Sequence, residues 1–141
     1  MQEAQRAAAP VVRGRPGWVR WPFRIVMTAA TVLLFNQAVY AGQFLSGSYG
    51  SLEVHRENAT YAGIAVVVAA VAAIPLRWPG RGPWWPIVGC LGLFACVALQ
   101  IYLGFSRLLT LHIPLGVAII VLAIGLSTWA WWPRRPGGSR A

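Results

Sequence analysis

Four long apolar runs constrain the fold of this chain more than any other feature of its sequence. They cover residues 25–45, 59–76, 86–106 and 111–132, and none of them contains Asp, Glu, Lys or Arg. A helix needs about 20 apolar residues to cross a hydrocarbon core of about 30 Å. Backbone groups in lipid have to be paired within their own segment, so we expect helices rather than strands.

The composition agrees with a membrane protein, because 57% of the residues are hydrophobic and only 11% are charged. We therefore predict an all-α fold: an integral membrane four-helix bundle. The predicted organisation is a disordered basic arm (1–21), a transmembrane domain (22–133) with helices at about 22–45, 56–76, 86–107 and 111–132, and a flexible basic tail (134–141).

The positive charge of the chain comes from arginine alone, and its distribution predicts an orientation. Ten of the twelve arginines lie in the arm, the start of the first helix, the middle connection and the tail; the other two are Arg56 and Arg107. Positive residues stay in the cytoplasm, so both termini are expected there, with the protein spanning a bacterial cytoplasmic membrane. Because these arginines sit in tails and short loops, the charge does not favour nucleic acid as a partner.

Polar residues interrupt the first apolar run. Val39-Tyr40-Ala41 resembles a signal-peptide cleavage site, but Asn36 and Gln37 break the apolar core such a peptide needs, so an uncleaved helix is favoured. Asn36, Gln37, Tyr40 and Gln43 have two interpretations. They hydrogen-bond between helices, or they line a pocket for a cofactor or quinone.

The chain contains two similar helical hairpins. Tyr40-Ala41-Gly42 and Tyr102-Leu103-Gly104 lie near the end of the first helix in each, and Gln37 and Gln100 precede them. His55 and His112 then stand at the start of the second helix in each. Four residues later come Ala59 and Gly116, on the same helix face as the histidine. Small residues there predict space for a flat ring.

Two histidines at the same depth of a bundle predict one bound haem b, with His55 and His112 as its axial ligands. Coordination by two imidazoles leaves no site for O₂ and favours electron transfer. Arg56 and Arg107 are candidates to pair with the haem propionates. Tyr40 and Tyr102 are candidates to hydrogen-bond around the ring.

Other interpretations of the same residues have less support. A single interfacial histidine is often only an amphipathic side chain. Zinc lacks a third ligand unless Glu53 or Glu57 supplies one. Cys90 and Cys96 form no C-x-x-C motif and are interpreted as small apolar residues. No catalytic motif or intramembrane acid is present, so enzymatic activity is not favoured and a proton-coupled transporter lacks its usual relay.

The segment Glu53-x-His55-Arg56 resembles the Glu…His-Arg motif of the haem A synthase family, and His112 resembles the second histidine of the same half. That family has eight helices in two four-helix, haem-binding halves. The resemblance covers residues 23–132 and implies one such half, with the two histidines as axial ligands. The glutamate spacing differs, an outer-loop cysteine pair is absent, and the synthase reaction would require two chains. The same layout also resembles small two-histidine, four-helix bacterial membrane proteins.

The predicted function is therefore haem binding, in electron transfer or in haem or oxidase assembly, at the outer face of the membrane. Besides the lipid bilayer, a larger respiratory or haem-biosynthesis complex and a homodimer are the expected partners. The alternative is a non-redox accessory or scaffold subunit of a larger membrane complex, held by tryptophans and small-residue helix faces.

Overall fold

The computed structural model describes residues 17–133. They form a short 3₁₀ helix η2 (Gly17–Arg20) and four α-helices, α1 (Trp21–Leu45), α2 (Ser51–Arg77), α3 (Trp85–Phe105) and α4 (Leu109–Trp131). Within this range there is no strand, so the all-helical prediction is confirmed. All four α-helices are long and apolar enough to cross a membrane, judged by length and composition. The predicted tail (134–141) and residues 1–16 of the predicted arm lie outside the described residues.

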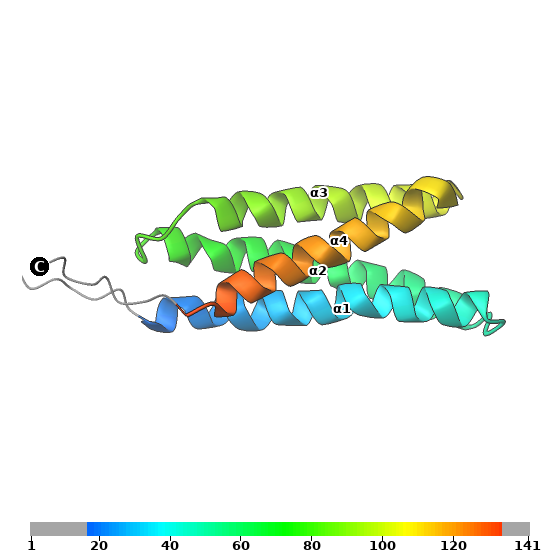
Figure 1. Ribbon diagram of the computed structural model, residues 1–141, viewed down its shortest axis with the longest axis horizontal. Helices are drawn as coiled ribbons and strands as arrows, with labels where there is room; N and C mark the ends of the chain where they lie inside the picture. Colours follow the sequence, from blue (N-terminus) through cyan, green and yellow to red (C-terminus); the bar gives the residue numbers. More distant parts are fainter. Residues whose placement is uncertain (1–16, 134–141) are drawn as a thin grey trace, which may run out of the picture.

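The four helices form an elongated bundle of two antiparallel hairpins, α1–α2 and α3–α4 (Figure 1). The main neighbours of α2 are α1 and α3, and the main neighbours of α4 are also α1 and α3. Helices α2 and α4 therefore lie on a diagonal of the bundle. Helix α4 crosses obliquely, starting beside α3 and ending beside α1 (Figure 1).

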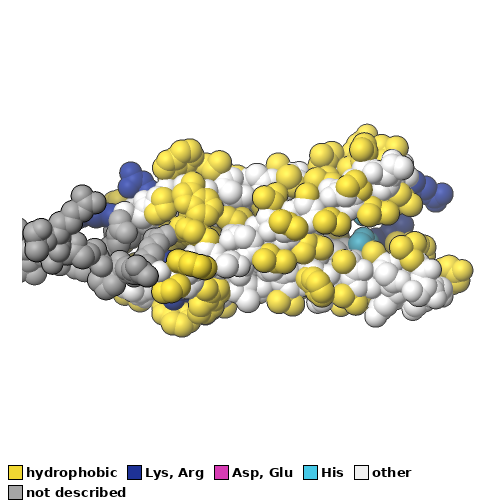
Figure 2. Space-filling view, in the orientation of Figure 1, with side chains coloured by type: hydrophobic (Ala, Val, Ile, Leu, Met, Phe, Trp, Pro, Cys, Tyr) yellow, Lys and Arg dark blue, Asp and Glu magenta, His cyan; other side chains and the backbone are white. Residues whose placement is uncertain are grey.

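Small side chains allow the helices to approach closely, and larger ones fill the remaining core. Ala62, Ala69 and Ala123 are almost fully buried, as are Met27 and Ile119. Without a strong hydrophobic drive between helices in lipid, such small-residue contacts and interhelical hydrogen bonds hold a bundle together. Most remaining large apolar side chains point outward and cover the surface (Figure 2). Such a surface would contact a lipid bilayer.

A buried asparagine joins the first hairpin. Asn58 is only 7% exposed, and its Nδ2 donates to the backbone carbonyl of Leu33 on α1, at 2.9 Å. An unpaired amide at this depth would be costly, so the bond ties α2 to α1. The sequence alone predicts no interhelical contact for Asn58.

Three predicted helices agree with the structure to within two residues at each end, but the start of α2 does not. It begins at Ser51, five residues before the predicted residue 56. Ser51 is buried, and its Oγ bonds to Gln43 Oε1 and to Ser48 Oγ, both at 3.1 Å. Glu53 in the first turn also suits the positive end of the helix dipole. These polar contacts extend the helix and place His55 in its second turn.

The predicted disordered arm extends too far along the chain. Its last residues form η2 and the first turn of α1, and Val19 is only 1% exposed. Helix η2 contacts both α1 and α2. Burial of Val19 therefore helps to order residues that are predicted from the sequence to belong to the disordered basic arm.

Tryptophans and tyrosines lie toward opposite ends of the bundle. All eight tryptophans lie at the end where α1 and α3 begin, and all four tyrosines lie toward the other end, with both histidines. The tryptophans are Trp18, Trp21, Trp78, Trp84, Trp85, Trp129, Trp131 and Trp132. Tryptophan and arginine together are typical of a membrane–water interface.

Replacing Arg24 with alanine should destabilise the bundle by about 2 kcal/mol. Arg24 Nε donates to the carbonyl of Ala130 at 2.9 Å, which satisfies a carbonyl in the last turn of α4. Its guanidinium also lies 5.5 Å from the Trp21 ring centre and 5.1 Å from that of Trp131. Thermal unfolding in detergent measures the loss.

The control for this change is Arg56→Ala. Arg56 forms a 3.8 Å ion pair with Glu53 in which both side chains are more than half exposed, and its guanidinium lies 5.8 Å from the Phe105 ring centre. Both contacts are exposed and neither satisfies a backbone carbonyl, so removal of Arg56 should cost clearly less than removal of Arg24. Equal melting temperatures for the two variants would contradict the proposal that the contacts of Arg24 with Ala130 and Trp131 hold α1 against α4.

Candidate functional site

The two histidines meet across the bundle. His55 comes from α2 and His112 from α4, and both side chains are half-buried. Their ring centres are 6.3 Å apart, and the ring planes are inclined by 53°. Helix α2 belongs to the first hairpin and α4 to the second, so each hairpin contributes one of the two rings. A histidine side chain is visible in a hollow among apolar side chains toward this end of the molecule (Figure 2).

Each histidine is held in the same way by the preceding helix of its own hairpin. Nδ1 of His55 donates to the backbone carbonyl of Gln37 at 3.1 Å, and Nδ1 of His112 donates to that of Gln100 at 2.9 Å. A carbonyl oxygen only accepts, so the proton of each neutral ring is on Nδ1. In each ring Nε2 is then left with its lone pair free to bind a metal.

This arrangement is typical of metal-ligating histidines, which nearly always donate their second ring N–H to a carbonyl, a carboxylate or water. The spacing also suits a shared metal. Two metal–nitrogen bonds of about 2 Å, with each ring centre roughly 1 Å behind its nitrogen, place the ring centres about 6 Å apart. Each imidazole can rotate about its own metal–nitrogen bond, so the 53° inclination between the two ring planes is compatible with a shared metal.

Gln37 and Gln100 belong to the site. The sequence leaves Gln37 open between an interhelical contact and the lining of a cofactor pocket, and it assigns no role to Gln100. Their backbone carbonyls orient the histidines, and Gln37 Nε2 also donates to the backbone carbonyl of His55 at 3.1 Å. Their matched places in the two hairpins were visible in the sequence. Gly104 is a further member, because a Cβ atom there would lie 3.0 Å from Cε1 of His112. It is the glycine of the second Tyr-x-Gly.

The two small residues after the histidines have different surroundings. Ala59 lines an apolar groove beside α2. Next to Gly116, however, the carboxamide of Gln100 fills the space, and a Cβ atom at Gly116 would lie 2.9 Å from Gln100 Nε2. The expectation that Gly116 leaves room for a flat ring is therefore wrong for this structure. The glycine accommodates a glutamine.

The remaining candidates lie around this end without touching the histidines. Arg56 is exposed, and its guanidinium lies 5.8 Å from the Phe105 ring centre. Arg107 is exposed too, in the connection between α3 and α4, with a φ of 56°. Tyr40 is half-buried and Tyr102 is 63% exposed. In the part of the chain that the structure describes, neither tyrosine hydrogen-bonds to His55 or His112.

A zinc site is not supported. Among residues 17–133 there is no group of three or more His, Cys, Asp or Glu side chains that could hold a metal ion, so Glu53 and Glu57 do not complete the histidine pair. Cys90 and Cys96 are free thiols, buried and half-buried. The burial of Cys90 and partial burial of Cys96 agree with their interpretation as small apolar packing residues. A ligand that requires only two protein donors remains compatible with the site.

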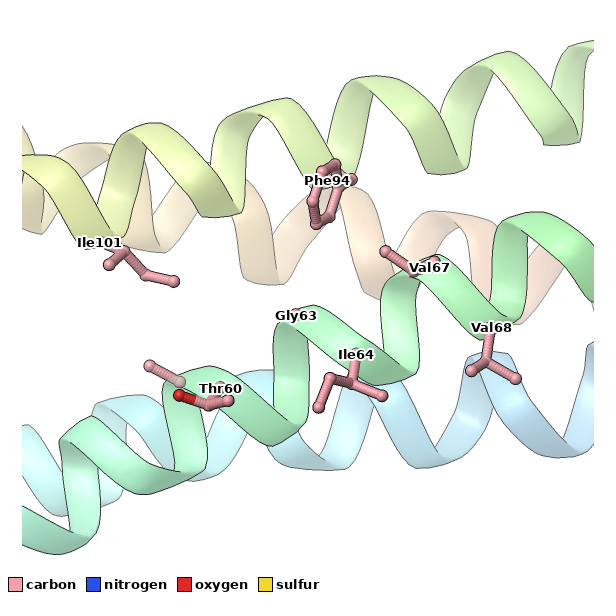
Figure 3. A pocket seen from close by; sticks show the side chains of 8 residues that line it. Thr60, Gly63, Ile64, Val67, Val68, Phe94 and Ile101 are labelled. Carbon is pink, nitrogen blue, oxygen red and sulfur yellow. The ribbon is translucent and has the colours of Figure 1, made fainter.

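An apolar groove runs along the outside of the bundle between α2 and α3 (Figure 3). Its first part has a volume of about 420 Å³ and begins at Ala59, one helical turn after His55. A second part of about 410 Å³ continues along the same two helices and shares Val67 and Phe94 with the first. The groove is lined almost entirely by hydrocarbon.

Comparison of the chain with protein-family models, with curated proteins and with solved structures gave no match.

Proposed function

We propose that this protein is a membrane haem protein that binds one haem b between His55 and His112. The observation that supports it most is that both rings direct Nδ1 to a backbone carbonyl and keep Nε2 free, with ring centres 6.3 Å apart. Bound haem would supply one-electron redox chemistry, without an open iron site for O₂. The function is then electron transfer, or haem handling during assembly of an oxidase.

In the proposed site, different residues would bind the iron, orient the ligands and contact the edge of the haem. The histidines donate their Nε2 lone pairs, and the carbonyls of Gln37 and Gln100 fix the tautomer and orientation of each ring. Arg56 and Arg107, at the same end of the bundle, offer positive charge to the propionates. Ala59 opens the α2 side toward an apolar groove, which suits the hydrocarbon edge of a porphyrin.

The proposal includes a location. The four helices span a bacterial cytoplasmic membrane, with the arginine-rich and tryptophan-rich end in the cytoplasm and the histidine end outside. Arg20, Arg24, Arg77 and Arg81 lie at the first end, whereas Arg56 at the second is accompanied by Glu53 and Glu57. One haem near one face cannot carry electrons across about 30 Å of hydrocarbon. A membrane partner, or a second copy of the chain, would complete the path.

The absorption spectrum of the protein purified from haem-replete cells tests this proposal. A red preparation whose reduced form has the sharp bands of a six-coordinate b-type haem, with one haem per chain, is the expected result. A preparation without colour would reject haem binding and favour a scaffold subunit.

Gly104→Ala should weaken haem binding by about tenfold. The added methyl group would lie 3.0 Å from Cε1 of His112, so the ring has to shift from its bond to the Gln100 carbonyl. Haem titration followed by absorbance measures the change. Gly42→Ala is the matched control, because it alters the equivalent glycine of the first hairpin and meets no atom within 4 Å. Equal losses for both would contradict a role for Gly104 in positioning His112.

A further inference from the structure

The outward face of α1 carries a heptad pattern that the bundle does not use for its own packing. The side of α1 that faces the core is formed by its buried residues, Phe23, Met27, Ala30 and Leu34. On the opposite side, six residues follow one another at alternating spacings of four and three: Ile25, Ala29, Val32, Asn36, Val39 and Gln43. Asn36 is half-buried and the other five are exposed. This alternation is typical of a seam along which two helices pack, and we call these six residues the outer seam.

Asn36 brings a carboxamide into the outer seam deep within the span. At about 1.5 Å per residue, it lies roughly 22 Å along α1 from Trp21 and roughly 14 Å from Leu45. It is therefore inside a hydrocarbon core of about 30 Å, where lipid chains offer neither a donor nor an acceptor. The carboxamides of Gln37 and Asn58 face the bundle and donate to backbone carbonyls, whereas Asn36 forms no hydrogen bond with another described residue. Such a side chain on a lipid-facing surface is costly unless a second helix pairs with it.

A second copy of the chain can supply that helix through the same surface. Copies inserted into one membrane have the same orientation, so two outer seams meet in parallel, and each Asn36 faces its own counterpart at the same depth. A carboxamide has two N–H donors and an oxygen acceptor, so two of them can bond reciprocally across a twofold axis. One asparagine in an apolar seam is known to fix the register and the number of parallel helices. Ala29 permits close approach of the backbones, and Val32 and Val39 pack on either side of the amide.

We propose that two copies of this protein associate through the outer seam of α1, with their Asn36 carboxamides hydrogen-bonded to each other at its centre. The dimer places two bundles side by side, with both histidine ends at the same face of the membrane. The inference requires that α1 crosses a bilayer. It concerns the outside of the bundle and does not depend on bound haem.

Disulfide cross-linking in the membranes of cells that produce the protein tests where the copies meet. On oxidation, Val32→Cys and Val39→Cys should each give a species of twice the chain mass. Leu99→Cys is the matched control and should stay single. Leu99 is exposed on α3, and its distance of about 21 Å from Trp85 along the helix lies between those of Val32 and Val39 from Trp21. The wild type, with its two native cysteines, gives the background. Equal cross-linking at all three positions, or none at any of them, would overturn the proposal.

Asn36→Val tests the hydrogen bond itself. Its dimer dissociation constant, measured by sedimentation equilibrium of the purified protein in detergent, should rise about tenfold. Asn36→Gln keeps a carboxamide and should retain most of the affinity. Asn58→Ala removes an asparagine that faces its own bundle and should dimerise as the wild type does. Because the Asn36 amide bonds no other described residue, Asn36→Val should fold and its monomer should melt no lower than that of the wild type.

Two results of the sedimentation experiment would overturn the proposal. One is an unchanged dissociation constant for Asn36→Val. The other is a wild type that stays monomeric at every concentration, which would assign the outer seam to lipid or to a different membrane protein. The outcome is separate from that of the haem test. A colourless protein that dimerises would reject only the haem site, and a red monomer would reject only the dimer.

Discussion

Either His55→Ala or His112→Ala is expected to abolish stable haem binding, with a loss of affinity well above 100-fold. Removal of an outer-shell partner of a metal ligand alone costs roughly 10- to 100-fold, and removal of the ligand itself costs more. The two single variants and the double variant should look alike, because six-coordinate haem needs both rings. Haem content per chain and the reduced absorption spectrum measure the effect.

Asn58→Ala is the control for the histidine variants. It removes an interhelical hydrogen bond one turn from His55 and should lower the stability of the bundle by about 1 kcal/mol. It leaves both imidazoles in place, so haem should be retained. If Asn58→Ala loses haem as completely as the histidine variants, the loss reflects a disturbed bundle rather than a missing ligand.

Gly82→Ala should destabilise the protein by about 3 kcal/mol, the upper part of the range for overpacking. In the connection between α2 and α3, the Gly82 N–H donates to the carbonyl of Leu76 at 2.7 Å, and a Cβ atom would lie 2.5 Å from the same oxygen. Neither group can move without breaking the end of α2. Unfolding by heat or denaturant in detergent measures the change.

Gly125→Ala provides the comparison for Gly82→Ala. Gly125 lies inside α4, and a Cβ atom there would meet nothing within 4 Å. Alanine favours a helix over glycine by up to about 1 kcal/mol, so this variant should be as stable as the wild type or slightly more stable. A similar destabilisation by both changes would show that the chain tolerates glycine loss poorly in general.

The helices could be predicted because apolar length is a strong and local property of a sequence. The start of α2 could not, since the buried bonds of Ser51 to Gln43 and Ser48 depend on how two segments meet. Asn58 illustrates the same limit. Its sequence context resembles a glycosylation sequon, and only the position of the Leu33 carbonyl makes it an interhelical contact.

The candidate site was accessible to sequence analysis only in part. The repeat identified His55 and His112 as a pair, and the structure brings their rings together across the bundle. The backbone carbonyls that hold them have no signature in the sequence, because every residue carries one. The error at Gly116 has a related cause: a small residue indicates free space, but not which side chain will occupy it.

The diagonal placement of α2 and α4 has a consequence for how the protein would be built. Each hairpin carries only one of the two rings, so neither hairpin alone could chelate a shared metal. A cofactor joining the rings would cross-link the hairpins, and its binding free energy would add directly to that of their association. Insertion would then precede loading, and the apoprotein would be the form in which the hairpins separate most readily.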